Sequence, residues 1–201
     1  VKKVFTVLIF FVGSFWGCGK QESNTPKQEK YTAGLVFDVG GRGDKSFNDA
    51  AYRGLEKVKK ELDINFEYIE PGQGADREAA LRQLSSRKEI SVIFGIGFIF
   101  TDDITNIARE FPDKKYACID YTVTPEARLP SNLVALEFKE EEGSFLVGAL
   151  AGLLTKTHKL GFVGGMQSPL IKKFEVAYVA GAKYVNPRTN VLIGYAGTAG
   201  E

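Results

Sequence analysis

The chain has 201 residues and a nearly balanced charge, with 26 Lys and Arg against 25 Asp and Glu. This balance gives no electrostatic basis for binding nucleic acid, because the basic residues are scattered rather than clustered. One His and two Cys that are far apart in the sequence provide neither a zinc-ligand pattern nor a Cys-His or Ser-His-Asp set. We therefore expect no metal, no cofactor and no nucleic acid.

The N-terminus is typical of an export signal, because two lysines precede the apolar run VFTVLIFFVGSFWG and then Cys18. The run is shorter than the roughly 20 apolar residues that span a bilayer. The Gly17-Cys18 pair resembles a bacterial lipoprotein signal, in which the cysteine is lipidated. We expect residues 1–18 to be the signal peptide and the polar residues 19–31 to be a flexible tether. An uncleaved anchor or a buried cysteine is the alternative.

Seven short apolar runs predict β-strands. Most of these runs are continuous rather than alternating, as in strands of a parallel sheet that are buried on both faces. The other cysteine, Cys118, lies inside one of them and is expected to be a small buried hydrophobic residue. The runs cover residues 31–39, 65–70, 91–97, 115–120, 132–138, 159–165 and 190–197.

Helical spacing of apolar residues predicts five helices between the strands. In the fourth helix, the residues on one face are small and include Gly148 and Gly152, which suits close approach to a sheet or to another helix. Thr101 is expected to cap the third helix. The patterns cover residues 51–62, 76–87, 101–111, 140–155 and 170–184.

Strands and helices alternate with a repeat of about 25 to 30 residues, which predicts right-handed βαβ crossovers and an α/β fold with a parallel sheet flanked by helices. Five strands precede residue 139, and the pattern starts again at Lys159. We therefore expect a complete first lobe over residues 32–156 and the start of a second lobe over residues 157–201. Because two strands and one helix form only a marginally stable unit, we expect this chain to be C-terminally truncated.

Three predicted strands end in residues that suit a ligand site. These residues are Asp38, Gly97 and Asp120. Ligands of open parallel sheets bind beyond the carboxyl ends of the strands, so we expect the loops after these residues to converge. Phe47, which can stack, and Asn48, which can donate and accept hydrogen bonds, follow the first strand. Together these groups suit a neutral, polar ring compound.

The glycine-rich loop GGRGDKSFND, which contains Phe47, does not fit a nucleotide phosphate. A Walker loop needs G-x-x-x-x-G-K-[ST], but Asp44 stands before Lys45 and would repel phosphate groups. A dinucleotide motif fails because Ser46 replaces its third glycine. Ser46 and Asp49 are expected to form a helix capping box, whereas the sequence leaves open whether Phe47 packs in the core.

The segment GLVFDVGGRGDKSFNDAAYRGLEK resembles the basic membrane protein family, the lipoprotein substrate-binding components of ABC transporters that include purine-nucleoside receptors. Further similar segments are VIFGIGFIFTDDI, FPDKKYACIDY, LVALEFKEEEGSFLVGALAGLLTKT, KLGFVGG and IKKFEVAYVAGAKYVNP. The resemblance extends from about Thr32 to the end of the chain. It implies a type I periplasmic-binding-protein fold, in which two α/β lobes joined by a hinge close on a ligand.

The resemblance also implies residue roles in binding a purine nucleoside. Phe47 and Phe174 resemble the two aromatic rings that hold the base, one from each lobe. For Phe174 the alternative is packing, because Val176, Ala177 and Ala180 in the same helix look like packing residues.

Four further residues match polar or backbone positions of the family's ligand site. Asp38 and Asn48 resemble groups that contact the base, and Asp120 resembles an acceptor for a ribose hydroxyl group. Gly97 resembles a glycine that lets the backbone approach the cleft.

By the same resemblance, the protein is expected to be a monomer that is lipid-anchored through Cys18 to the cell membrane, on its extracytoplasmic side, and that delivers a nucleoside to an ABC permease and ATPase. The alternatives are a ligand-sensing receptor of the same fold and a secreted nucleoside- or sugar-acting hydrolase. The hydrolase would use Asp38 and Asp120 as an acid/base pair, but no nucleophile with an activating base accompanies them. We therefore expect a binding protein and no enzyme.

Other members of the family have longer chains. Their additional residues supply most of the second lobe and the return crossings of the hinge. Because such proteins bury the ligand between two closing lobes, we expect the 201-residue chain alone to bind weakly or not at all.

Overall fold

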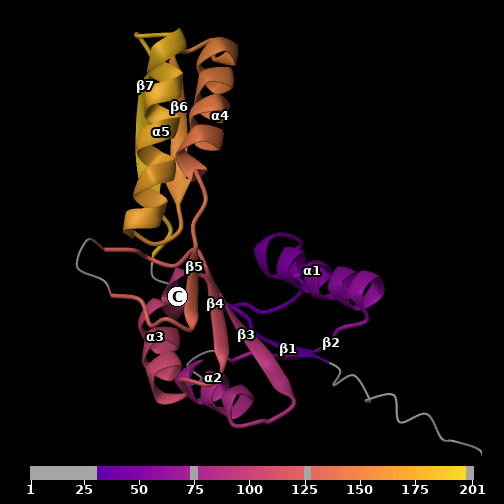
Figure 1. The fold of residues 1–201 in the computed structure, drawn as a ribbon. Helices are drawn as coiled ribbons and strands as arrows, with labels where there is room; N and C mark the ends of the chain where they lie inside the picture. Colours follow the sequence, from indigo (N-terminus) through magenta and orange to yellow (C-terminus); the bar gives the residue numbers. More distant parts are fainter. Residues whose placement is uncertain (1–30, 73–76, 125–127, 198–201) are drawn as a thin grey trace, which may run out of the picture.

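The computed structural model describes residues 31–72, 77–124 and 128–197. Within these ranges the chain forms seven strands and five α-helices, and the α/β class predicted from the sequence is confirmed (Figure 1). The predicted signal peptide, the predicted tether up to residue 30 and the predicted lipidation site Cys18 lie outside the described residues.

Five parallel strands form the first sheet, in the order β2-β1-β3-β4-β5. β1 is buried along its whole length, as its continuous apolar sequence predicted. Each apolar run predicted in this part of the chain corresponds to one strand, and only β3 starts one residue before its predicted run. The strands are β1 (Thr32–Val36), β2 (Asn65–Ile69), β3 (Ile90–Ile96), β4 (Lys115–Ile119) and β5 (Leu133–Leu136).

Helices cover both faces of this sheet (Figure 1). α1 (Phe47–Leu62) lies on one face, and α2 (Arg77–Ser85) and α3 (Thr101–Glu110) lie on the other, with the 3₁₀ turn η1 (Phe98–Phe100) before α3. Successive β1 side chains alternate between the two faces, so Leu35 packs on the α1 side and Val36 on the α2 and α3 side.

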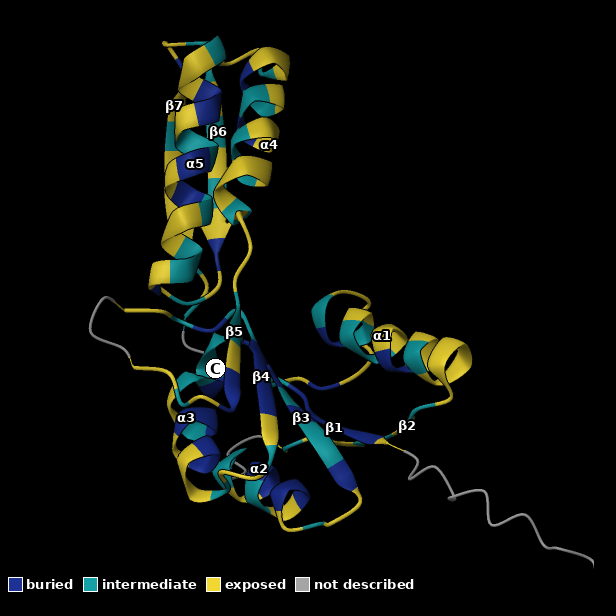
Figure 2. Ribbon diagram, viewed as in Figure 1, coloured by how far each residue is buried: buried dark blue, intermediate teal, exposed yellow. Residues whose placement is uncertain are grey.

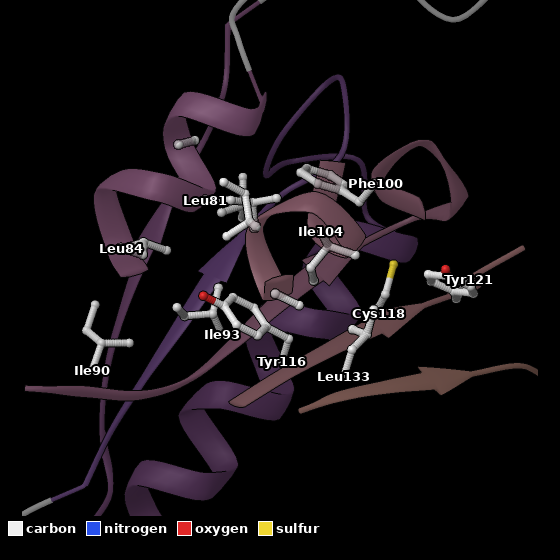
Figure 3. Packing of buried hydrophobic residues seen from close by; sticks show 14 residues of the cluster. Leu81, Leu84, Ile90, Ile93, Phe100, Ile104, Tyr116, Cys118, Tyr121 and Leu133 are labelled. Atoms are coloured by element: carbon white, nitrogen blue, oxygen red, sulfur yellow. The ribbon is translucent and has the colours of Figure 1, made fainter. Parts of the chain in front are cut away.

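The larger core lies between the sheet and the pair α2 and α3. Figure 3 shows side chains of both helices meeting those of the strands. Cys118 is fully buried there, as predicted, and burial raises the pKa of its thiol to about 12. The labelled residues of this core are Leu81, Leu84, Ile90, Ile93, Phe100, Ile104, Tyr116, Cys118, Tyr121 and Leu133.

A second α/β body follows the sheet. It consists of α4 (Glu140–Leu154), β6 (Lys159–Gly164), α5 (Pro169–Val185) and β7 (Asn190–Tyr195), with the two strands parallel and adjacent. Figure 1 shows α4 and α5 side by side, away from the helices of the first sheet. Because α4 packs on α5, we propose that the boundary between the two bodies lies at residues 137–139 rather than after residue 156.

The small residues of α4 set how closely α4 approaches α5. A Cβ atom at Gly148 would overlap the backbone carbonyl of Tyr178, and one at Gly181 of α5 would overlap the carbonyl of Phe145. Gly152 is similarly close to the backbone of Ala182. The face of small residues recognised in the sequence therefore serves helix-helix contact.

Much of the second body is exposed (Figure 2), and its exposed residues include many with large apolar side chains. Leu146, Leu150 and Leu153 lie on the side of α4 turned away from α5, and Val163 lies exposed on β6. In contrast, the first body buries most of its large apolar residues around one sheet. The first body therefore holds most of the buried core within the described residues.

The cap predicted at Thr101 is wrong. Thr101 is the first residue of α3, and Phe100 occupies the N-cap position without a side-chain hydrogen bond. The Thr101 hydroxyl instead donates to the Phe98 carbonyl over 2.7 Å and accepts from the Thr122 amide over 3.0 Å. The preceding 3₁₀ turn allows this, because it continues directly into the helix.

The contact between α4 and α5 can be tested with a matched pair of alanine variants. Gly148→Ala should lower the free energy of unfolding by roughly 1–3 kcal/mol, as expected for overpacking. Gly143→Ala, in the same helix but with nothing within 4 Å of the added methyl group, should raise it by up to about 1 kcal/mol through helix propensity. Urea unfolding followed by circular dichroism measures both, and equal effects would contradict the packing.

Candidate ligand-binding site

The loop between β1 and α1 is held by two carboxylates, that of Asp44 in the loop and that of Asp49 in the first turn of α1. Asp44 accepts hydrogen bonds from the backbone amides of Ser46, Asn48 and Asp49 at 2.8–3.1 Å. These amides, first that of Ser46, lower the pKa of Asp44. Asp49 in turn accepts from the amides of Gly43 and Lys45, both at 2.9 Å.

These hydrogen bonds bear on two predictions for the loop, the capping box and the absence of a nucleotide-phosphate motif. Ser46 stands at the N-cap of α1 but makes no side-chain capping hydrogen bond, so the capping box with Asp49 is wrong. Asp44 takes the capping role instead. Because protein carboxylates already occupy these amides, the loop has no free cradle for a phosphate at this point, in agreement with the rejection of a nucleotide motif.

Asp38, Asn48 and Gly97 lie together at the carboxyl edge of the sheet. The buried Asn48 accepts a hydrogen bond from the Asp38 amide through Oδ1 at 3.1 Å, which ties the start of α1 to the end of β1. Gly97 has a φ of 108°, and a Cβ atom there would lie 2.7 Å from Asp38 Oδ2. The site therefore needs glycine at position 97 both for its backbone conformation and for space.

The Asp38 carboxylate is partly removed from water. Burial raises its pKa, while the Val39 amide, which donates to Oδ1 at 2.6 Å, and the charge of Arg77 oppose this effect. An acceptor held in this way can form a strong hydrogen bond with a donor of a ligand, since the competing water is limited.

Asp120 follows β4 and faces the second body. It adopts a φ of 58°, and its amide donates to the Leu136 carbonyl at 2.8 Å. Its side chain lines a cavity of about 80 Å³ together with Glu137, Glu140 and Lys173. Burial raises the pKa of Asp120, the charges of Glu140 and Asp38 add to this rise, and Lys173 opposes it.

The two predicted stacking rings have different surroundings. Phe47 is partly buried at the start of α1 and packs against the core on that side, as its alternative role in packing proposed. Phe174 lines a hollow of about 510 Å³ between α4, β6 and α5, whose lining residues all belong to the second body. The cavity at Asp120 is lined by Lys173 and by neither Phe47 nor Phe174. The stacking role of both rings therefore stays a prediction.

Glu140 and Lys173 also line the cavity at Asp120, although the sequence predicted neither of them there. Glu140 begins α4, four residues after the end of β5. Its position beyond the carboxyl end of the fifth strand is a signal for this edge of the sheet. Lys173 offered no signal, because its place in the cavity depends on the way α5 turns toward the sheet edge.

No metal-binding group of three or more His, Cys, Asp or Glu residues occurs among the residues that the structure describes. Within the same ranges, no helix combines the length and the hydropathy needed to cross a membrane.

The parallel sheet, its acidic carboxyl edge and the adjoining second α/β body define a periplasmic-binding-protein-like chain. Residues 31–201 match the sequence profile of the Bmp family, described as "ABC transporter substrate-binding protein PnrA-like". The chain belongs to this family, as its resemblance to basic membrane proteins predicted.

Individual relatives agree with this assignment. An uncharacterized lipoprotein of Pyrococcus abyssi is 36% identical over 97% of this chain and 49% of its own length. Basic membrane protein A1 of Borrelia garinii is 34% identical over 98% of this chain and 57% of its own length. A solute-binding protein of an ABC transporter system from Aeropyrum pernix has a similar crystal structure, with a TM-score of 0.72 and 31% identity over 83% of this chain and 47% of that one. The chain spans about half the length of the curated relatives it matches first.

Replacing Asp120 by Asn should stabilise the fold at pH 7. Asn also tolerates a positive φ, and the substitution removes a carboxylate that burial and two neighbouring acids disfavour. Because the folded pKa of Asp120 is raised, the stability linked to this group is fully present below its unfolded pKa of about 3.9 and is lost as the pH rises through the folded pKa.

The gain from Asp120→Asn should therefore shrink as the pH falls toward 4. Urea unfolding at several pH values measures it, with the exposed Asp113→Asn as the control that should change little. A lower stability of Asp120→Asn at pH 7 would refute this reading of the site.

Proposed function

We propose that the protein is an extracytoplasmic solute-binding lipoprotein of an ABC importer and that it binds purine nucleosides between its two α/β bodies. The observation that carries this proposal is the placement of Asp38 and Asp120 at the carboxyl edge of the first sheet, with the cavity at Asp120 shared by both bodies. Membership of a family described as ABC transporter substrate-binding proteins supports it.

The chemistry of this edge suits a neutral ligand that donates hydrogen bonds. Carboxylates accept hydrogen bonds from N–H and O–H groups, which a purine base and a ribose provide. Asp38 and Asn48 would serve the base, Asp120 a ribose hydroxyl group, and Phe47 would stack on the base. Gly97 would leave space for the ligand beside the backbone.

The proposed location and partners follow from the same family. Several relatives are named lipoproteins or membrane proteins, which supports a lipid anchor at Cys18 on the extracytoplasmic side of the cell membrane. An ABC permease and its ATPase would receive the ligand. Because the family is described by substrate binding, we propose binding without turnover. We also propose a monomeric protein, as expected from the sequence resemblance.

Calorimetric titration of the full-length gene product with adenosine and inosine tests the proposed ligand class. Phe47→Ala should weaken binding by roughly 1–3 kcal/mol, the range measured for the stacking of bases on aromatic rings. Phe47→Leu keeps an apolar side chain against the core but removes the ring, so it separates stacking from packing. Unchanged affinity in both variants would exclude the stacking role, and no binding of any nucleoside by the unmodified protein would exclude the proposed ligand class.

The 201-residue chain alone should bind nucleosides far more weakly than a protein with a complete second lobe. Among the described residues its second body has two strands, and affinity in this architecture depends on closing two lobes over the ligand. Titration of the 201-residue polypeptide with inosine and adenosine checks this expectation, and submicromolar affinity would contradict it.

A further inference from the structure

We propose that Arg42 is a positioning residue for the ligand site, and that it holds the glycine-rich loop between β1 and α1 in the conformation that places Phe47 and Asn48. This inference rests on the proposed solute-binding function and deepens it, because that function uses no contact of Arg42. The Arg42 side chain is exposed and does not line the cavity at Asp120. Arg42 would therefore act through the loop and not by touching the ligand.

The backbone of this loop has little conformational preference of its own. Gly40, Gly41 and Gly43 have φ values of 95°, 59° and 97°. Glycine adopts such values without strain, but it loses more conformational freedom on folding than any other residue. Among residues 40–43 only Arg42 carries a side chain. The position of this stretch therefore depends on contacts with the rest of the protein, and Arg42 is the residue whose side chain can make them.

Arg42 contacts three residues outside the loop. Its amide donates a hydrogen bond to Glu70 Oε2 over 3.0 Å, and its Nη1 atom donates to the Tyr68 hydroxyl group over 2.9 Å. Its Cζ atom lies 3.6 Å from the centre of the Tyr52 ring, which is a cation–π contact. Gly41 makes room for the first contact, because a Cβ atom there would lie 2.6 Å from Glu70 Oε2. Since Tyr68 belongs to β2 and Tyr52 to α1, Arg42 ties the loop to two separate elements.

The aromatic partners of Arg42 are themselves packed against the core. The rings of Tyr52 and Tyr68 meet edge to face, with their centres 5.5 Å apart. Tyr68 meets the fully buried Phe37 in the same way, also at 5.5 Å. Such aromatic pairs are favourable beyond the area that they bury. The guanidinium group of Arg42 therefore stacks on a surface that the core of the first body holds in place.

The loop leads from Arg42 to the proposed ligand residues through two hydrogen bonds. The amide of Gly43, the next residue, donates to Asp49 in the first turn of α1 over 2.9 Å. In the same turn, Asn48 accepts from the Asp38 amide over 3.1 Å. A loop that left its place at Arg42 would loosen the first of these bonds and free the start of α1 to move relative to the end of β1.

The contacts of Arg42 should act on the loop rather than on the whole fold. Arg42, Tyr68 and Glu70 are all exposed, and exposed polar contacts contribute little to the free energy of unfolding. A surface loop can open while the core stays folded. The apparent affinity for a ligand then falls in proportion to the fraction of molecules in which the loop is in its binding conformation.

Amide hydrogen exchange of the ligand-free 201-residue polypeptide tests whether Arg42 holds the loop. Arg42→Ala removes both side-chain contacts, so the amides of Gly43 and Lys45, which donate to Asp49, should exchange about 3-fold faster or more. The amides of β3 should not change. Arg53→Ala removes the same charge from an exposed position of α1 and should leave the exchange of the loop unchanged. Unchanged exchange in Arg42→Ala would overturn the inference.

Calorimetric titration of the full-length gene product with adenosine measures the consequence for binding. Arg42→Ala should weaken binding about 3- to 10-fold. Arg42→Lys keeps the charge but loses the planar group that stacks on the ring, so its affinity should lie between those of Arg42→Ala and the unmodified protein. Arg53→Ala should bind as the unmodified protein does. Equal losses in Arg42→Ala and Arg53→Ala, or faster loop exchange with unchanged affinity, would overturn the positioning role.

The two measurements separate this inference from the function on which it rests. If the unmodified protein binds no nucleoside, the proposed function fails and the role of Arg42 in binding fails with it, whereas hydrogen exchange still decides whether Arg42 holds the loop. Urea unfolding of each variant identifies a loss of binding that is caused by a loss of folded protein. In that case Arg42→Lys replaces Arg42→Ala in both measurements.

Discussion

Parallel pairing of five strands directs the carboxyl ends of all of them to one edge of the sheet, and the candidate site depends on this single constraint. Asp38 lies two residues after the end of β1, Gly97 follows β3 and Asp120 follows β4. Residues far apart in the sequence thereby share one environment, in which the charges of Glu140 and Asp38 add to the rise of the pKa of Asp120 that burial causes. Burial of negative charge at this edge is unfavourable by itself, and hydrogen-bond donors of the proposed ligand would offset that cost.

Much of the first body could be predicted, because the local pattern of apolar residues in its strands matches the way in which those strands are buried. β1 is buried on both faces, so its continuous apolar run was a direct signal. The position of Asp38 and Asp120 at the sheet edge could be predicted because they stand where strands end, whereas their role in binding stays a prediction. Gly97 was placed at this edge by the same rule, and the structure shows why a glycine stands there, since it has a positive φ and lies beside a carboxylate.

Other features could not be predicted, because two nearby residues were equally suited to a position and only the three-dimensional structure decides which of them occupies it. Asp44 and Asp49 both stand near the start of α1, and only the loop conformation decides that Asp44 caps the helix. Likewise, Lys173 and Phe174 are adjacent, yet the rotation of α5 turns Lys173 toward the cavity and Phe174 into the hollow beside β6. The small residues of α4 indicated close contact but not that α5 would be the neighbour.

The contact between α4 and α5 has an evolutionary consequence. The groups that fill the space above Gly148 and Gly181 are backbone carbonyls, those of Tyr178 and Phe145, and not side chains. A larger residue at either position therefore cannot be accommodated by a smaller residue on the opposite helix, since every residue carries the same carbonyl. These two glycines should lack second-site suppressors, and they should stay invariant without co-varying with any position across the interface.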